Sequence, residues 1–317
     1  MRPTEIKEQI LELPTHSNFN IIILTGSSLR HKRFALKLQK EFPDLIAAWY
    51  QIDKNMEPKY QYGHRRNIKK GISHRKKFTK LIKILKNQIS NFLIDPNHIY
   101  HTFKTFYNFC LIRNFNKKFL ISEKNIFDYE MESLKKFAII KSTTINPIDL
   151  NTPQFCKTLK DHNAYFIVSL GGPLLSNKVI ESINGVALNQ HSGHSPNYRG
   201  SKTIEWALYH RDIKSLSNTV HLTTTSADSG PIIRRSNICL HPDDNPHDIF
   251  FKSVALGTEL IIEVIKEIIS KKNILVFKQP KFVGKTYLAK ELSGNILVSI
   301  IKDFKNKWLM QALYKKW

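Results

Sequence analysis

Two polar residues at the end of an apolar segment have the types and the spacing that carbonyl chemistry needs. Asn189 and His191 are two positions apart, and they close an apolar run at residues 185–189 that reads as a buried strand. Side chains two residues apart in a strand point to the same face, so an amide and an imidazole are expected to lie together. Such a pair can polarise a carbonyl group and stabilise the oxyanion that forms when a nucleophile attacks it.

A carboxylate is expected beside this pair. Asp228 follows an alternating segment at residues 219–225, which predicts another strand. A carboxylate here can orient His191, hold its ring protonated and relay a proton through water. By itself each feature has a simpler explanation, because an Asp before Ser-Gly usually forms a turn. Asn189, His191 and Asp228 together form a more specific candidate for catalysis.

The segment after His191 is rich in turn-forming residues and predicts a loop that wraps a ligand. It leads directly out of the strand that carries His191, so its residues are candidates to bind the substrate: Ser192, Tyr198, Arg199 and Gly200. His221, within the strand at 219–225, is interpreted instead as a packed or hydrogen-bonded core residue. Trp206 is interpreted as core.

The elements around these residues predict a doubly wound α/β domain with a mostly parallel, Rossmann-like sheet. The continuous apolar run at 20–26 is typical of a strand buried on both faces of a parallel sheet. A helix capped by Ser27 and Ser28 and a strand at 45–50 complete a βαβ opening, and in such folds the ligand crevice lies at the carboxyl ends of the strands. Further strands are expected at 137–141, 164–170, 185–189 and 219–225, and helices at 152–161, 176–183, 205–210 and 246–270.

The 317-residue chain is strongly basic, with 49 Lys and Arg against 26 Asp and Glu and a formal net charge of +23. This charge favours an anionic partner such as tRNA, a nucleotide-linked substrate or anionic lipid. The abundance of Lys, Asn and Ile also fits AT-rich coding, which would make the charge compositional. We also expect a basic helical insert at about 64–118. Its alternatives are a solvated surface helix, an anion-contacting helix near the acceptor site and a membrane-surface helix.

The cysteines and the hydropathy pattern indicate a cytoplasmic protein. Cys110, Cys156 and Cys239 are widely spaced, which fits a reducing compartment and predicts neither a disulfide framework nor a zinc site. The N-terminus has no apolar signal region, and no stretch of 18 apolar residues would span a membrane. No metal is expected, and the oligomeric state is left open.

Four segments together resemble the formyltransferase family. They are SLGGPLL at 169–175, LNQHS at 188–192, SPNYRG at 195–200 and ADSGPII at 227–233. The family includes glycinamide ribonucleotide, methionyl-tRNA and sugar-amine formyltransferases and the related formyltetrahydrofolate hydrolases. The resemblance covers residues from about 165 to 268.

The resemblance implies a one-carbon transfer in which an amine attacks the formyl group of 10-formyltetrahydrofolate without a metal. It implies that Asn189 and His191 stabilise the oxyanion and that Asp228 assists removal of the proton from the ammonium. It further implies a catalytic domain at 1–270, with 271–317 as a short C-terminal extension. The formyl donor is expected to bind at Leu170, Gly171, Gly172, Pro173, Leu174 and Ala227.

Departures from the family pattern leave the acceptor open. Relatives usually have an HxSLLP segment where this chain has Gly193-His194-Ser195, and the loop at 25–31 either holds a phosphate with Arg30 and His31 or is an ordinary turn. The first expectation is a small or nucleotide-linked amine, such as an amino sugar, and an anionic one. The alternatives are methionyl-tRNA formylation, formyltetrahydrofolate hydrolysis and a binding module without turnover.

Overall fold

The computed structural model describes residues 8–14, 18–53, 96–271, 273–280 and 283–314. The chain forms two compact units, one made of Met1–Glu57 with Phe119–Trp317 and the other of Pro58–Lys118. Helix α3 (Pro96–Leu134) begins in the second unit and ends in the first. The first part of the predicted insert, at 64–95, lies outside the described residues, so its helix stays a prediction.

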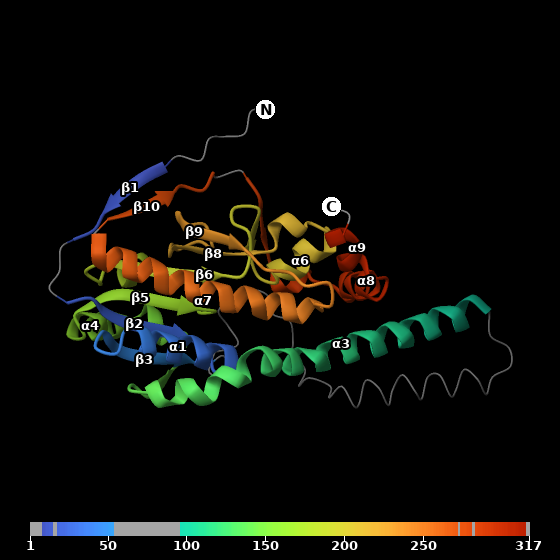
Figure 1. The fold of residues 1–317 in the computed structure, drawn as a ribbon, viewed down its shortest axis with the longest axis horizontal. Coiled ribbons are helices and arrows are strands. Elements are labelled where there is room, and N and C mark those ends of the chain that lie inside the picture. The colour runs from blue at the N-terminus through green and yellow to red at the C-terminus, as the bar shows by residue number, and fades with distance from the viewer. Residues whose placement is uncertain (1–7, 15–17, 54–95, 272, 281–282, 315–317) are drawn as a thin grey trace. The chain divides into compact units, whose positions relative to one another are not determined.

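Five parallel strands form one side of a nine-stranded sheet (Figure 1). Their order is β4-β3-β2-β5-β6, and all four neighbouring pairs are parallel. Every residue of β5 is buried, as expected for a strand covered on both faces. The strands are β2 (Asn20–Thr25), β3 (Ile46–Ile52), β4 (Ser142–Ile145), β5 (Ala164–Leu170) and β6 (Val186–His191).

Four antiparallel strands extend the sheet beyond β6, in the order β8-β9-β10-β1. They are β8 (Ser217–Leu222), β9 (Ile232–Asn237), β10 (Asn273–Phe277) and β1 (Glu8–Glu12). A separate two-stranded parallel sheet joins β7 (Tyr198–Gly200) to β11 (Lys285–Tyr287). The segment after residue 271 therefore contributes one strand to each sheet.

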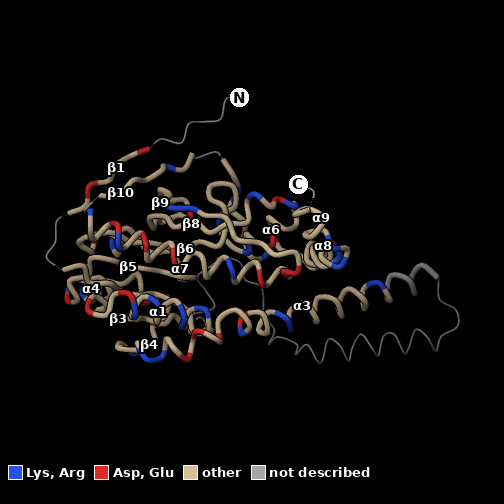
Figure 2. Tube along the Cα trace, in the orientation of Figure 1, with Lys and Arg blue, Asp and Glu red and all other residues tan. Residues whose placement is uncertain are grey.

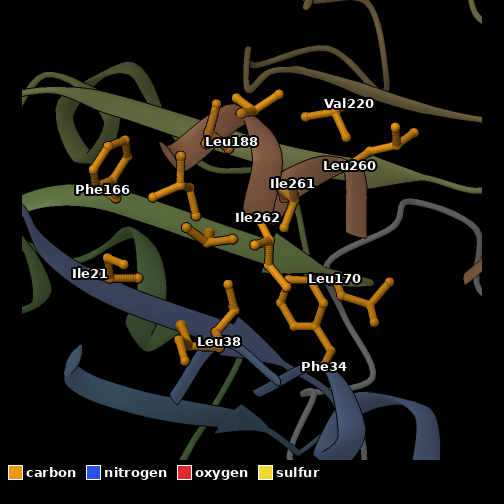
Figure 3. Packing of buried hydrophobic residues seen from close by; sticks show 14 of the residues in the cluster. Ile21, Phe34, Leu38, Phe166, Leu170, Leu188, Val220, Leu260, Ile261 and Ile262 are labelled. Atoms are coloured by element: carbon orange, nitrogen blue, oxygen red, sulfur yellow. The ribbon is translucent and has the colours of Figure 1, made fainter. Parts of the chain in front are cut away.

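Helices cover both faces of the large sheet, which confirms the doubly wound α/β prediction. On one face α1 (Leu29–Glu41) and α7 (Pro246–Lys271) pack over the strands (Figure 1). Figure 3 shows Phe34 of α1 and Ile262 of α7 close together above the sheet. On the other face α4 (Pro153–Asp161) and α5 (Asn177–Ile180) bury a second apolar cluster.

A third apolar cluster lies around the small sheet. It joins α6 (Thr203–Tyr209) to α8 (Gly294–Lys305) and α9 (Trp308–Tyr314). Short 3₁₀ helices complete the described elements: η2 (Lys135–Phe137), η3 (Asp149–Asn151), η4 (Ile213–Ser215) and η5 (Ala289–Glu291).

The strand expected at 137–141 is wrong. Phe137 ends η2, residues 138–141 form a loop, and the strand begins at Ser142. The side chain of Ile139 is 55% exposed, and the backbone N–H of Ile140 donates to the side chain of Gln39 (2.7 Å) instead of to a neighbouring strand. A short apolar run at the end of a helix cannot be told from a strand by periodicity alone.

Both acidic and basic residues occur along α3 and α7, whereas α1 carries mainly Lys and Arg (Figure 2). Some of these charges form ion pairs between helices, such as Arg33 with Glu130 (2.6 Å) and Lys37 with Glu259 (3.0 Å). Among the described helices, none has both the length and the apolar character needed to cross a bilayer.

Candidate active site

Strand β6 places Asn189 and His191 on one face at the carboxyl end of the parallel strands. Its neighbours set the register: Ser169 of β5 and His221 of β8 both lie opposite Asn189. The period of two that the sequence predicts is therefore observed, and both flanking strands add a polar side chain beside Asn189.

Asn189 is held by hydrogen bonds at both ends of its amide. The hydroxyl of Ser169 donates to Asn189 Oδ1 (2.9 Å). Asn189 Nδ2 lies 3.2 Å from Asp228 Oδ1 and 3.2 Å from His221 Nε2. The amide N–H group therefore points toward the carboxylate of Asp228.

The ring of His191 is 5% exposed and has a partner at each nitrogen. Nδ1 lies 3.2 Å from Asp228 Oδ2, and Nε2 lies 2.8 Å from the carbonyl oxygen of Tyr198. Two acceptors around one ring match the two N–H groups of a protonated imidazole. A Cβ at Gly193 would lie 2.3 Å from His191 Nε2, so glycine at this position leaves the room that the ring occupies.

Asp228 is the common partner of these groups. Its Oδ2 also accepts the backbone N–H of Gly200 (2.8 Å), and its Oδ1 lies 3.2 Å from His221 Nε2. Burial by itself would raise the pKa of Asp228, but His191, His221 and the Gly200 N–H hold that pKa well below its usual range. The carboxylate therefore stays ionised, and its φ of +47° is a left-handed conformation that non-glycine residues seldom adopt.

His221 is a site residue that the sequence interpretation put in the core. It is 2% exposed, as a core residue would be, yet its Nε2 faces Asp228 while Nδ1 lies 2.8 Å from the carbonyl of Leu222. The signal that identifies it is positional: it lies opposite Asn189 in the neighbouring strand and seven residues before Asp228. Register between β6 and β8 supplies that information, and the sequence alone did not.

A cavity of about 850 Å³ lies beside the Asp228 loop. It brings together three of the predicted binding residues, Leu174, Arg199 and Ala227, with a wall from the segment after β10 that includes Lys278 and Gln279. The full lining is Gln9, Leu174, Arg199, Thr225, Ser226, Ala227, Ser229, Pro231, Val276, Lys278, Gln279, Pro280 and Thr286.

The other residues predicted to bind the formyl donor lie at the end of β5 and in the turn that follows it. They do not line this cavity. Leu170 is buried at the end of β5, and Gly171 has a φ of +72°. Gly172 and Pro173 continue the turn toward Leu174, whose side chain is 43% exposed.

The other residues predicted to bind the substrate contribute mainly through their backbone. The ring of Tyr198 stacks on Tyr287 (centroids 5.7 Å apart), and its hydroxyl donates to Asp212 (3.2 Å). Burial, followed by the charge of Asp212, raises the pKa of Tyr198. The carbonyl of Ser192 accepts a hydrogen bond from the Thr203 hydroxyl, and Gly200 offers its N–H to Asp228.

The loop at 25–31 is an ordinary strand-to-helix turn. The backbone N–H and the guanidinium of Arg30 both donate to Glu123 of α3 (3.1 and 2.9 Å), so a carboxylate of the chain itself occupies the start of α1. His31 is buried and bonds to Ser28 (2.8 Å). These contacts do not support the phosphate site that the sequence left open. Within the described ranges no three His, Cys, Asp or Glu side chains gather as metal ligands would.

Known proteins match the part of the chain that carries this site. Residues 112–265 match the family model described as formyl transferase. The methionyl-tRNA formyltransferase of Thermodesulfovibrio yellowstonii is 32% identical over 133 residues, which are 42% of this chain and 42% of that protein. That of Lactobacillus acidophilus is 30% identical over 126 residues, 39% of this chain and 40% of its own length. The match thus spans about two fifths of these relatives.

Among solved structures, a sugar N-formyltransferase from a Shewanella species is similar with a TM-score of 0.48 and 10% identity, covering 86% of this chain and 78% of that one. Asn189, His191, His221 and Asp228 all lie within the segment that matches the family model. Residues 112–265 thus match the formyl transferase family, as the resemblance of the sequence predicts.

Proposed function

We propose that the protein is a folate-dependent N-formyltransferase that moves a formyl group from 10-formyltetrahydrofolate to an amine. The observation that carries the proposal is the convergence of Asn189, His191 and His221 on the ionised carboxylate of Asp228. An oxyanion needs N–H donors, and an attacking amine needs a proton acceptor. This cluster contains both within one hydrogen-bonded group.

The residues of that cluster can take part in each step of the transfer. The acceptor nitrogen first forms a bond to the formyl carbon, and the bond from that carbon to N10 of the folate then breaks. The amide of Asn189 and the ring N–H of His191 stabilise the oxyanion between these events. Asp228 takes up the proton released by the acceptor nitrogen and passes it, through water, toward the N10 leaving group.

The same donors have partners within the protein. Asn189 Nδ2 is bonded to Asp228, and His191 Nε2 to the carbonyl of Tyr198. These contacts keep both side chains ordered until the formyl oxygen competes for their N–H groups, which lowers the cost of orienting them during the reaction.

The cavity beside Asp228 is suitable for the formyl donor. Its volume falls within the range of about 300–1,000 Å³ that ligand pockets usually have. It offers apolar walls at Leu174 and Ala227. The donor site we propose combines these residues with the turn formed by Leu170, Gly171, Gly172 and Pro173.

The acceptor we propose is a small or nucleotide-linked amine that carries a negative charge, such as an amino sugar. Arg199 and Lys278 line the cavity, and no acidic side chain is among its lining residues. The second candidate is methionyl-tRNA, because the relatives with 30–32% identity are methionyl-tRNA formyltransferases. The cytoplasmic location expected from the sequence stays a prediction, and no metal is assigned a role.

The deciding experiment incubates the full chain with 10-formyltetrahydrofolate and a panel of amines while tetrahydrofolate release is followed. The panel contains nucleotide-linked amino sugars, neutral amines of similar size and methionyl-tRNA. We expect release only with an anionic small acceptor. Release of formate without any acceptor would identify a hydrolase, and no release with the whole panel would contradict transfer.

A further inference from the structure

The loop that carries Asp228 is held in an uncommon backbone conformation. Asp228 has a φ of +47°, in the left-handed region, and a Cβ at Gly230 would lie 1.8 Å from the carbonyl oxygen of Leu222. The loop is therefore pressed against the end of β8. A conformation of this kind persists only where surrounding contacts determine it.

The contact that closes the loop on its other side comes from far along the chain. Gln279 Nε2 donates to the carbonyl oxygens of both Asp228 (2.9 Å) and Gly230 (2.6 Å). The Gln279 side chain is 8% exposed, so it uses both amide N–H bonds in a place where water does not compete. It spans the turn immediately behind the carboxylate.

The same C-terminal segment also fixes the strand that faces the carboxylate. β11 pairs with β7 so that Lys285, Thr286 and Tyr287 lie opposite residues 198, 199 and 200. Lys285 N donates to the carbonyl of Asn197 (3.0 Å), and the carbonyl of Tyr287 accepts the N–H of Ser201 (2.8 Å). β7 thereby presents the two backbone groups that the site uses, the Tyr198 carbonyl to His191 and the Gly200 N–H to Asp228.

Two glycines allow β7 and the segment before β11 to approach this closely. Gly200 has a φ of +88°, and a Cβ there would lie 2.3 Å from the carbonyl oxygen of Tyr287. Gly284 has a φ of +75°, and a Cβ there would lie 1.9 Å from the carbonyl oxygen of Pro196. Both conformations favour glycine, so the close contact depends on both residues.

We propose that residues 278–280 and 283–287 are part of the active site and that Gln279 is a positioning residue, holding Asp228 at hydrogen-bond distance from Gly200, His191 and His221. This inference rests on the proposed function. Gln279 touches the loop backbone and not the reacting atoms, so it acts through Asp228. A reacting group displaced by about 1 Å can lose about 100-fold in rate, which sets the size of the expected effect.

The test compares Gln279→Met, which keeps length but removes both N–H donors, with Gln279→Glu, which places carboxylate oxygens against the two carbonyls. The control is Leu275→Gln on β10, whose side chain is 42% exposed and is not among the residues that line the cavity. We expect kcat to fall about 100-fold in both Gln279 variants, with KM for the donor within threefold of the wild type and the control unchanged. A fall below threefold in both variants, or an equal fall in Leu275→Gln, overturns the proposal.

A measurement that needs no turnover separates this proposal from the proposed function. The carboxyl carbon of Asp228, observed by ¹³C NMR in the folded wild-type chain, should not titrate above pH 4. In Gln279→Met the carboxylate loses its fixed distance to the Gly200 N–H, so its pKa should rise and a titration should appear between about pH 3 and 5. If the wild type transfers no formyl group but this shift is observed, only the proposed function fails. An unchanged titration in a folded Gln279→Met overturns the positioning role.

Discussion

At the scale of single residues, the site is organised by one carboxylate with several donors. Asp228 is within hydrogen-bond distance of side chains from β6 and β8 and of the backbone N–H of Gly200. In the charged form it satisfies all of these donors, whereas a protonated carboxyl would leave some of them unpaired. Substitutions that keep the shape of this residue but change its charge are therefore the most informative.

Asp228→Asn should lower kcat by about 100- to 10,000-fold. The amide cannot accept the proton from the acceptor nitrogen, and its own N–H group opposes the N–H groups of Asn189 and Gly200. Tetrahydrofolate release measures the rate, and near-ultraviolet circular dichroism verifies that the fold is kept. Turnover within tenfold of the wild type would contradict a proton-transfer role for Asp228.

His191→Ala should abolish turnover and keep the fold, because it removes an oxyanion donor and a partner of Asp228. We expect kcat to fall at least about 100-fold. His241→Ala is the matched control, since its ring is exposed and lies away from the cluster. A His191→Ala variant with near-native activity would refute the mechanism.

Because of His194, we expect the free energy of unfolding to depend on pH, independently of turnover. Burial, then the charge of Arg235, lowers its pKa to about 4, while Ser217 lies 3.2 Å from its Nδ1. The unfolded chain, with a histidine pKa near 6.5, binds more protons between pH 6.5 and 4, so stability falls as the pH falls through this window.

Replacing this histidine with leucine, which carries no titratable group, should remove that part of the pH dependence. Urea unfolding at pH 7.5 and pH 5.0 compares the wild type with His194→Leu. We expect a smaller loss of unfolding free energy on acidification in the variant. Equal losses in both proteins would show that His194 is not the group responsible.

At the scale of elements, continuous apolar runs made much of the fold predictable. β2, β5 and β6 are buried on both faces, and the sequence predicted each of them to within a few residues. β1 and β10 were missed because their burial is partial and because they pair across more than 250 residues, as Gln9 does with Val276. For the same reason no local pattern indicated Gln279, whose partners are 49 and 51 residues away.

The junction of α1 with α3 and α7 carries a prediction on stability. Glu123 is 3% exposed and accepts hydrogen bonds from the backbone N–H and from the guanidinium of Arg30. This guanidinium lies 5.7–6.0 Å from the ring centroids of Phe119, Phe250 and Phe251. Glu123→Ala leaves the Arg30 cation, whose side chain is 20% exposed, without this partner, so we expect a loss of about 1–3 kcal/mol in unfolding free energy.

Glu132→Ala is the matched control on the same helix. Glu132 pairs with Lys135, and their side chains are 85% and 64% exposed, so water can replace the lost partner. Chemical denaturation with a common m-value compares the two variants. If both cost the same, burial of the Glu123 pair is not what stabilises this junction.

At the scale of the whole molecule, one segment carries a disproportionate share of the positive charge. Residues 54–95 contain 12 of the 49 Lys and Arg and 2 of the 26 Asp and Glu. In the described remainder, Figure 2 shows both basic and acidic residues along α3 and α7. A small anionic acceptor needs only the Arg199 and Lys278 side chains of the cavity, whereas a polyanion such as tRNA would also gain from the basic segment.

Salt dependence distinguishes these two uses of the charge. We expect kcat/KM for a small anionic acceptor to change less than tenfold between 50 and 200 mM salt, since few ions are released. The triple variant Arg75→Gln, Lys76→Gln, Lys77→Gln should leave that value unchanged and should weaken the salt dependence of bulk tRNA binding. If methionyl-tRNA supports turnover, and its kcat/KM falls by about 1,000-fold over the same range and depends on these three charges, the acceptor is the nucleic acid and the small-amine assignment is wrong.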